Sequence, residues 1–314
     1  MTVLAVQPVA KVLEPGPFTT VQDAGRHGYR RFGVPASGAL DLLSLSAANG
    51  QLGNKPDSPA LELFQGPVVI EALADLVVGH SDGSSLVSVD GGATQANPLR
   101  IKGGSVLRLE AGAGSAILYL AFPGGIVVDS VMGSASTYTR ASFGGVRGRI
   151  IQKGDILYAQ RDVERNVSRR EMHLELPRRH RVVRGPHAEL FPPESLRSFF
   201  EAEYHVSFQS DRMGYRLEGP ALKGFHEWGR VLTFPVFPGM VQVTPDGLPI
   251  VLMADCQTTG GYPVIALVLP SDLCALARKP PSSPVAFKEV TEEEARTAMV
   301  SFTESIGVGQ DVKH

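Results

Sequence analysis

Short apolar runs alternate with turn residues along most of the chain, which is typical of β-strands rather than of long helices. The clearest runs, 105–110 and 116–122, are joined by a glycine-rich loop and predict a β-hairpin. Two segments, 39–52 and 192–204, have the composition of helices. The 34 glycines and 23 prolines also favour a turn-rich fold. The pattern therefore predicts a mainly β protein with a few short helices.

One stretch, Val251–Tyr262, joins an apolar run to an unusually polar turn. The run ends at Asp255 and is followed by Gln257, Thr258, Thr259, Gly260, Gly261 and Tyr262. A Gly-Gly pair can take positive φ, and successive backbone amides in such a turn can bind an anion. The alternative is a hairpin corner whose hydroxyl and carboxylate groups only satisfy the turn. The stretch is a candidate site with both interpretations open.

A second turn precedes this stretch and leads into the same strand. Its Pro245-Asp246-Gly247 sequence has strong turn chemistry, which is the structural interpretation. If the flanking strands pair as a hairpin, Gln242 lies opposite Met253 or Asp255. Gln242, Asp255 and Gln257 would then converge on a planar polar ligand such as an amide or ureido group.

Other polar motifs carry weaker indications of chemistry. Asp23, Arg26 and His27 either lock a tight turn or bind an anion. The segment 79–83 matches the Gly-x-Ser-x-Gly elbow of serine hydrolases, but that motif needs a helix after it and 84–90 alternates like a strand. The eight histidines and two cysteines show no metal-ligand spacing, and Cys256 lacks the context of a nucleophile.

The second half of the chain repeats motifs of the first half. An Arg-x-Gly-Tyr-Arg-x-x-Gly motif at 26–33 recurs at 212–219, and 63–68 is answered by 236–241. The segments 63–68 and 236–241 are 173 residues apart, and at this offset Asp82 corresponds to Asp255. Several matches in the same order predict an internal duplication with two similarly folded domains and a cleft between them.

A change of composition marks the expected domain boundary. Residues 161–184 contain eight arginines and four acids but few apolar positions, which favours a solvated linker over an anion-binding patch. We expect an N-terminal domain at 1–165, a linker at 166–180 and a C-terminal domain at 181–314.

Overall composition excludes several classes of function. With 314 residues, 43% apolar content and a formal net charge of −2, the chain has no electrostatic basis for binding nucleic acid or an anionic membrane. Two cysteines make no disulfide framework, and the N-terminus has no signal-peptide pattern. No apolar run has the length of a membrane span. The expected location is cytoplasmic.

Three long motifs resemble one known family. They are Gly16–Tyr29 with Gly33–Asp41, then Ser134–Asp155, and finally Ser210–Pro220 with Asp255–Pro263. Together they resemble the biotin-dependent carboxyltransferase family, also called allophanate hydrolase subunit 2, KipA or the C subunit of 5-oxoprolinase. The resemblance covers about residues 10–290 and implies two cyclophilin-like β-barrel domains. The chain departs from the family pattern at Thr233-Phe234 and at 277–282.

The resemblance implies one member of a hetero-oligomeric amide- or lactam-processing enzyme. The expected activities are ATP-dependent cleavage of 5-oxoproline to glutamate, or carboxyl transfer as in urea carboxylase. The expected partners are a KipI-like protein, the B subunit of 5-oxoprolinase, and a LamB/YcsF-type protein, its A subunit. Because the chain has no biotin-attachment motif and no ATP loop, these partners would supply ATP and any biotin. The alternatives are a non-catalytic KipA-like regulator that antagonises a KipI-like kinase inhibitor and, from fold analogy alone, a peptidyl-prolyl isomerase.

This interpretation assigns roles to ten residues and none to a metal. We expect Asp255, Gln257, Thr258 and Thr259 to be catalytic, with Asp255 orienting the site or acting as a base and amides near 258–261 stabilising an oxyanion. The expected substrate-binding residues are Gln242, Asp246, Gly260, Gly261, Tyr262 and Arg26.

Overall fold

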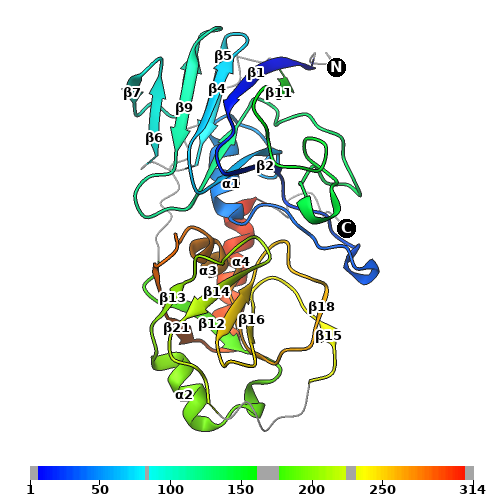
Figure 1. The fold of residues 1–314 in the computed structure, drawn as a ribbon, viewed down its shortest axis with the longest axis vertical. Coiled ribbons are helices and arrows are strands. Elements are labelled where there is room, and N and C mark those ends of the chain that lie inside the picture. The colour runs from blue at the N-terminus through cyan, green and yellow to red at the C-terminus, as the bar shows by residue number, and fades with distance from the viewer. Residues whose placement is uncertain (1–5, 82–84, 161–176, 224–230, 308–314) are drawn as a thin grey trace. The chain divides into compact units, whose positions relative to one another are not determined.

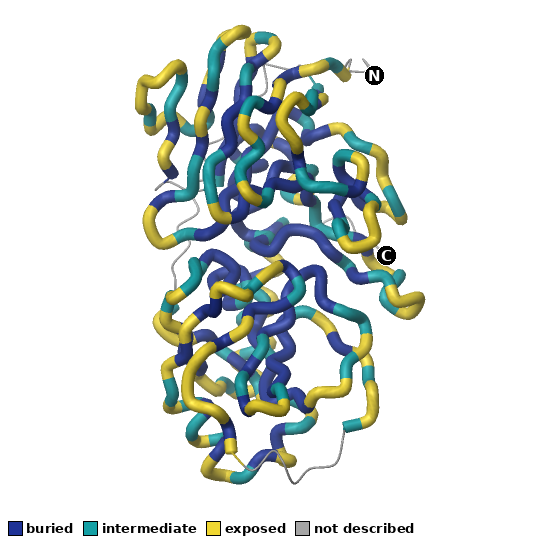
Figure 2. Tube along the Cα trace, in the orientation of Figure 1, coloured by how far each residue is buried: buried dark blue, intermediate teal, exposed yellow. Residues whose placement is uncertain are grey.

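The computed structural model describes residues 6–81, 85–160, 177–223 and 231–307, and they form two compact units (Figure 1). The second unit takes in His27–Ala36 as well as residues within Glu175–Ser305. Most of the expected linker, 166–180, lies outside the described residues. Within each unit the buried residues follow the strands, and the exposed ones gather in loops (Figure 2).

The first unit contains two sheets. One has the order β11-β1-β4-β9-β6-β7, and the other has the order β2-β3-β10-β5-β8. The strands are β1 (Val6–Glu14), β2 (Phe18–Gln22), β3 (Ala60–Phe64), β4 (Val68–Ala72), β5 (Leu76–His80), β6 (Leu86–Val89), β7 (Gly92–Thr94), β8 (Leu99–Ile101), β9 (Val106–Glu110), β10 (Ile117–Ala121) and β11 (Ile156–Gln160). Apolar side chains from both sheets form one core.

Helix α1 (Leu42–Gly50) confirms the helix predicted at 39–52. It begins where Asp41 accepts a hydrogen bond from the Ser44 amide at 3.1 Å, an N-cap that satisfies one of the free amides of the first turn. The helix packs on β5 and β10. A Cβ at Gly79 would lie 2.5 Å from the Ala48 carbonyl oxygen, so only glycine permits this approach. The first glycine of the apparent hydrolase elbow therefore serves helix packing.

The hairpin predicted at 105–110 and 116–122 is wrong, although both strands exist. Strand β9 pairs with β4 and β6, whereas β10 pairs with β3 and β5 in the other sheet. The burial of the two strands gives the reason, since β10 is buried at every position while β9 alternates. A fully buried strand and a half-exposed strand fit different layers of the fold.

The second unit is built around an eight-stranded sheet with the order β20-β13-β14-β17-β16-β19-β12-β21. Its strands are β12 (His180–Arg184), β13 (Tyr204–Val206), β14 (Gly214–Glu218), β16 (Met240–Val243), β17 (Pro249–Leu252), β19 (Val264–Val268), β20 (Pro284–Val285) and β21 (Phe287–Glu289). A two-stranded sheet adds β15 (Phe234–Pro235) and β18 (Thr259–Gly260).

The eight-stranded sheet is nearly closed. Its two terminal strands, β20 and β21, are separated in the chain by Ala286 alone, so the edges of the sheet must meet. Such closure gives a barrel-like sheet with protected edges. The mainly β fold class is thereby confirmed.

Three α-helices accompany this sheet. They are α2 (Pro193–Glu201), α3 (Pro270–Ala277) and α4 (Glu292–Ile306), and α2 confirms the helix predicted at 192–204. Single 3-10 turns occupy Arg30–Phe32, Thr139–Ala141 and Ala188–Leu190. No helix within the described parts of the chain is both long and apolar enough to cross a membrane.

Some of the repeated segments fall on strands at corresponding positions. At the offset of 173 residues, β4 falls on β16 and β5 falls on β17. The first arginines of the repeated motif, Arg26 and Arg212, are both buried, with 1% and 4% exposure. The strand partners differ, because β4 lies between β1 and β9 whereas β16 lies between β17 and β19.

Candidate amide-binding site

The two predicted glutamines come together in the second unit. Gln257 Nε2 donates to Gln242 Oε1 at 3.4 Å, and Gln242 Nε2 donates to the Tyr262 carbonyl at 3.2 Å. Gln242 is buried on β16, while Gln257 is half-buried in the turn after Asp255. A buried primary amide next to a half-open one offers both donors and acceptors to a planar polar ligand.

The route by which Gln242 reaches this position differs from the prediction. β16 and β17 do pair as a hairpin, but Gln242 lies opposite Ile250 rather than Met253 or Asp255. The turn between them spans only 244–248, because Val243 already pairs with Pro249. The contact with Gln257 arises instead because the chain turns back at 253–258 before entering β18.

The positive φ that a Gly-Gly pair permits is not adopted at Gly260 or Gly261. Gly260 is extended because it belongs to β18, which pairs with Phe234–Pro235, and Gly261 follows directly after this strand. The predicted anion-binding turn therefore does not form at these glycines. Gly260 is required for a different reason, since a Cβ there would lie 2.8 Å from Gln242 Nε2 and 3.3 Å from Val236 Cγ1.

A cation that was not predicted as a site residue, Arg30, completes the cluster. It lies in the segment His27–Ala36 that belongs to the second unit. Its Nη2 donates to the Val236 carbonyl and, at 3.2 Å, to the Gln257 carbonyl. Its Nη1 is buried and makes no hydrogen bond to any residue that the structure describes. A buried guanidinium N–H without a partner has a strong unmet demand for an acceptor.

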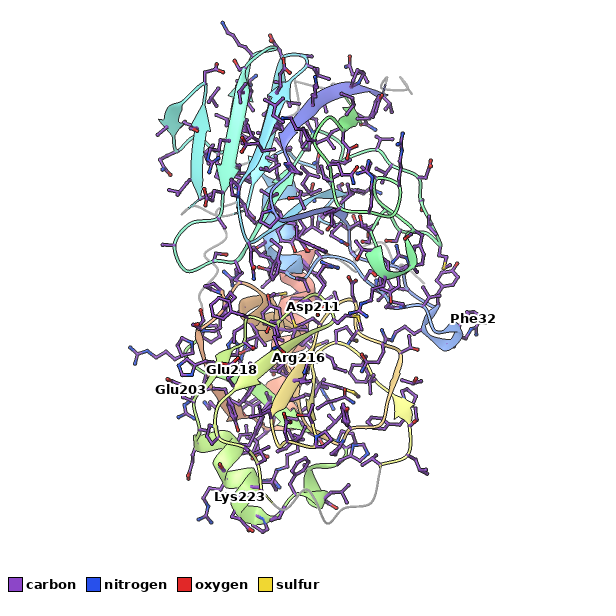
Figure 3. All side chains as sticks on the ribbon, in the orientation of Figure 1. Phe32, Glu203, Asp211, Arg216, Glu218 and Lys223 are labelled. Carbon is purple, nitrogen blue, oxygen red and sulfur yellow. The ribbon has the colours of Figure 1, made fainter. Side chains whose placement is uncertain are left out.

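Arg30 was not predicted, because in the sequence it is distinguished only as the second arginine of the repeated motif. The repeat aligns it with Arg216, which is exposed on β14. Nothing in the spacing indicates that 27–36 belongs with residues two hundred positions away. Phe32, in the middle of this segment, is 66% exposed and projects outward (Figure 3).

Asp255 is held in a buried ion pair. Arg212 Nε and Nη2 donate to its two carboxylate oxygens at 2.8 and 3.1 Å, and its own amide donates to the Arg212 carbonyl at 2.8 Å. Both side chains are almost completely buried. A bidentate pair of this kind fixes the start of the turn that carries Gln257. The geometry supports the orienting role expected for Asp255 rather than the role of a base.

Cys256 lies in the core beneath the site. It packs with Val236, Leu252 and Val264. Burial raises the pKa of its thiol to about 11, although the charge of Arg30 and a hydrogen bond from its side chain act in the opposite direction. The thiol is therefore protonated at neutral pH and is not a nucleophile.

The other predicted residues lie in different surroundings. The carbonyl of Thr258 accepts a hydrogen bond from the Val236 amide, whereas Thr259, Gly261 and Tyr262 are exposed. Asp246 is exposed in the hairpin turn, where it accepts hydrogen bonds from the Thr244 hydroxyl and the Leu248 amide.

Arg26 belongs to the first unit and makes locking contacts there. Its Nη2 donates to the Ser136 carbonyl, and its guanidinium lies 4.7 Å from the centre of the Phe143 ring. Asp23 likewise accepts hydrogen bonds from Ser134, Ala135 and Ser136. This second polar cluster matches the turn-locking alternative for Asp23 and Arg26.

The remaining motifs show structural roles. Asp82 and Gly83 of the apparent elbow lie outside the described residues, while Ser81 Oγ accepts from the Tyr119 amide at 3.0 Å. The chain continues into β6 rather than into a helix, which an elbow would need. Across the described ranges, no group of three or more His, Cys, Asp or Glu side chains could hold a metal ion.

Comparison with known proteins identifies the family. The carboxyltransferase domain family, subdomains A and B, matches residues 32–289. The chain belongs to this family. Within it, the chain is 37% identical over 290 residues to the C subunit of 5-oxoprolinase from Escherichia coli, a match that covers 92% of this chain and 93% of that protein. It is 35% identical to the Haemophilus influenzae protein of the same name, over 88% and 89% of the two chains.

A solved structure of the family agrees with the fold. Urea amidolyase of Kluyveromyces lactis matches with a TM-score of 0.85 and 29% identity, over 96% of this chain and 20% of that chain. The chain thus spans nearly the whole length of the bacterial proteins but only about a fifth of urea amidolyase.

Proposed function

We propose that the chain is the C subunit of a 5-oxoprolinase and that the cluster of Gln242, Gln257, Gly260 and Arg30 binds the lactam group. The observation that carries the proposal is the pairing of two glutamine amides beside a buried guanidinium N–H that has no hydrogen-bond partner among the described residues. The similarity to 5-oxoprolinase C subunits over nine-tenths of the chain supports it.

The chemistry of a lactam suits these groups. Its carbonyl accepts hydrogen bonds and its N–H donates one, and a glutamine side chain can answer both. Arg30 Nη1 provides a charge-assisted donor for the carbonyl oxygen. As the amide bond is attacked, negative charge develops on that oxygen, and each donor already in place stabilises it by about 3–4 kcal/mol. The Arg212–Asp255 pair would keep Gln257 in position.

ATP and partner proteins complete the proposed enzyme. The bacterial relatives are named as subunits, which supports an assembly with other chains. For these chains we propose a KipI-like B subunit and a LamB/YcsF-type A subunit. The same cluster fits the ureido group of biotin, which also presents a carbonyl beside N–H groups. Arg30 and Gln257 would hold that group, which supplies a carboxyl group when carboxylated.

The decisive experiment reconstitutes glutamate release from 5-oxoproline and ATP with the products of the neighbouring genes. We expect omission of this chain to abolish release. Replacing Gln257 by alanine should lower turnover about tenfold or more while the complex still assembles, because one donor to the carbonyl is lost. Gln209→Ala is the matched control, since Gln209 is exposed in the same unit. Unchanged turnover in Gln257→Ala would refute the assignment.

Carboxyl transfer to an amide acceptor is the second candidate. It is favoured by the family itself and by the match to urea amidolyase. A reconstituted complex that transfers carboxyl groups but releases no glutamate would support it. A stable complex with neither activity would instead support the regulatory alternative.

A further inference from the structure

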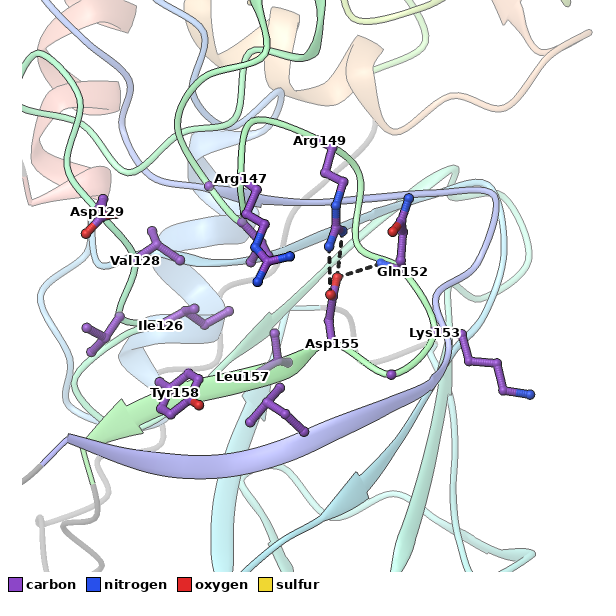
Figure 4. Close-up of a pocket in the computed structure, with 15 residues that line it drawn as sticks. Ile126, Val128, Asp129, Arg147, Arg149, Gln152, Lys153, Asp155, Leu157 and Tyr158 are labelled. Atoms are coloured by element: carbon purple, nitrogen blue, oxygen red, sulfur yellow. Dashed lines mark hydrogen bonds and ion pairs between the residues drawn. The ribbon is translucent and has the colours of Figure 1, made fainter.

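The first unit contains a pocket that plays no part in the proposed amide chemistry. Its volume is about 720 Å³, and it is lined by residues 126–129, 145–147, 149 and 152–158 (Figure 4). All of these residues belong to the first unit, whereas the amide cluster belongs to the second. The size is that of a site for a small organic ligand.

One side of the pocket is apolar. Ile126 and Leu157 are buried beneath it, while Val127 and Tyr158 keep 40% and 44% of their surface exposed. Exposed apolar side chains next to a cavity provide a surface on which the carbon skeleton of a ligand can lie.

A fixed ion pair forms the polar wall. Arg149 Nη1 and Nη2 donate to the two oxygens of Asp155 at 2.7 and 2.8 Å, and the Gln152 amide donates to the same carboxylate at 2.8 Å (Figure 4). Arg149 is the main reason that the pKa of Asp155 lies below its ordinary value, and the more distant charge of Arg147 adds to the effect. The carboxylate is therefore neutralised by Arg149, its own bidentate partner.

Arg147 occupies a conformation that an arginine rarely adopts. Its φ is +56°, in the left-handed region. Its neighbours Gly145 and Gly148 also have positive φ, and a Cβ at either would collide with Thr137 or Ser142. The backbone on both sides of Arg147 is thus fixed, and glycine would fit its position with less strain. Strain kept at a non-glycine residue points to a use for the side chain.

Cationic side chains outnumber carboxylates on the lining, and two of them have no hydrogen-bonded partner among the described residues. Arg147 and Lys153 form no hydrogen bond or ion pair with any other residue in the described parts of the chain. The remaining lining carboxylate, Asp129, lies across the pocket from Lys153 (Figure 4). Arg147 extends over the apolar side, between Val128 and Asp155 (Figure 4).

We propose that this pocket binds a small organic anion, with Arg147 and Lys153 holding a carboxylate or phosphate and the apolar side holding the carbon skeleton. A guanidinium and an ammonium above an apolar surface bind such molecules through charge-assisted hydrogen bonds and burial of carbon. This site is independent of the lactam chemistry proposed for the second unit.

The test uses the full chain and three probes of one shape: benzoate, phenyl phosphate and neutral benzamide. Binding is measured by titration calorimetry. We expect saturable binding of one or both anions, and at least about tenfold weaker binding of benzamide, because only the anions form charge-assisted hydrogen bonds. The stronger of the two anions identifies carboxylate or phosphate as the preferred group.

Substitution of Arg147 separates binding from folding. Arg147→Gly should weaken anion binding about tenfold or more without lowering the melting temperature, since glycine suits the left-handed backbone. Arg147→Lys should retain part of the affinity. Arg100→Gln, an exposed arginine of β8 outside the lining, should bind like the wild type. Absence of saturable binding up to about 10 mM, equal binding of benzamide, or unchanged binding in Arg147→Gly would each overturn the proposal.

Discussion

Gly260 and Gly261 are adjacent in the chain but have different surroundings. A Cβ on Gly260 would meet Gln242 Nε2 at 2.8 Å, whereas one on Gly261 would meet nothing closer than 3.5 Å. At the residue scale the site therefore depends on a single missing methyl group, which lets β18 approach the buried glutamine.

Replacing Gly260 by alanine should reduce activity with little effect on stability. The new methyl group would displace the end of the Gln242 side chain, which can move at small cost, but the amide would then be misplaced. Such a shift lowers turnover by about tenfold to a hundredfold. Gly261→Ala, measured in the same reconstituted assay and by thermal unfolding, is the control and should behave as wild type. Equal turnover in both variants would contradict this role of Gly260.

The Arg212–Asp255 pair makes a separate prediction about stability. Asp255→Asn removes the bidentate carboxylate from the buried Arg212 guanidinium and should lower the free energy of unfolding by about 3–5 kcal/mol. The double variant Arg212→Met, Asp255→Leu should recover most of this loss, because neither charge is then left buried alone. Urea unfolding measures both. A double variant less stable than the single one would show that the pair contributes more than mutual compensation.

At the scale of elements, β12 begins with a histidine that the sheet buries completely. His180 Nδ1 lies 3.1 Å from the Asp272 carbonyl of α3, so Nδ1 carries the proton. Its Nε2 has no partner among the residues described. Burial, with help from the charge of Lys279, lowers the pKa of His180 from 6.5 to about 4. The strand therefore accommodates the neutral imidazole and opposes the charged one.

This pKa predicts a loss of stability in mild acid. The unfolded state takes up the proton near pH 6.5 and the folded state only near pH 4. The contribution of His180 to the free energy of unfolding is therefore fully present above pH 6.5 and declines as the pH falls towards 4. The total loss is up to about 3 kcal/mol. His180→Asn should flatten the pH dependence of urea unfolding in this window, and His205→Asn, on an exposed histidine, should not. Parallel curves for wild type and His180→Asn would contradict this account.

Elements were easier to predict than their partners. The helix at 42–50 follows from its Ala- and Leu-rich composition and from the cap at Asp41, both of which are local. The pairing of β9 and β10 could not be read locally, because burial by other strands decides which sheet each one joins. The predicted register of β16 on β17 was wrong for a related reason, since the register depends on where the turn at 244–248 closes.

The candidate site was predictable where its residues are close in sequence. Gln257 follows the strand end directly, and Gln242 lies on the neighbouring strand of the hairpin. Arg30 could not be found in this way, because its contacts to Val236 and Gln257 span more than two hundred residues. Polarity alone also does not separate Asp255, which is locked in an ion pair, from a residue free to act on a ligand.

At the scale of the whole molecule, the second unit is not a continuous part of the chain. It needs His27–Ala36, which are encoded far from the rest of the unit. Arg30 from this segment lies over the core that contains Cys256. A C-terminal fragment therefore lacks one part of its own candidate site.

This arrangement predicts the behaviour of separated fragments. In a fragment of residues 177–314 alone, Cys256 should react with Ellman's reagent faster than in the full chain, because Arg30 and its segment no longer cover that part of the core. Adding a fragment of residues 1–160 should restore protection, and the same fragment with Arg30→Gln should restore less of it. Reactivity of Cys274, buried elsewhere in the unit, reports general unfolding. Full protection of Cys256 in the isolated fragment would refute the prediction.

The position of His27–Ala36 in the chain also affects how such genes can recombine. A crossover between two homologous genes anywhere from codon 37 to codon 241 would give an offspring protein that inherits Arg30 from one parent and Gln242 and Gln257 from the other. Chimeras of this kind would lose activity unless the two parents have the same residues at 27–36. In directed evolution, residues 27–36 should therefore be exchanged together with the C-terminal half, as if the two pieces were one cassette.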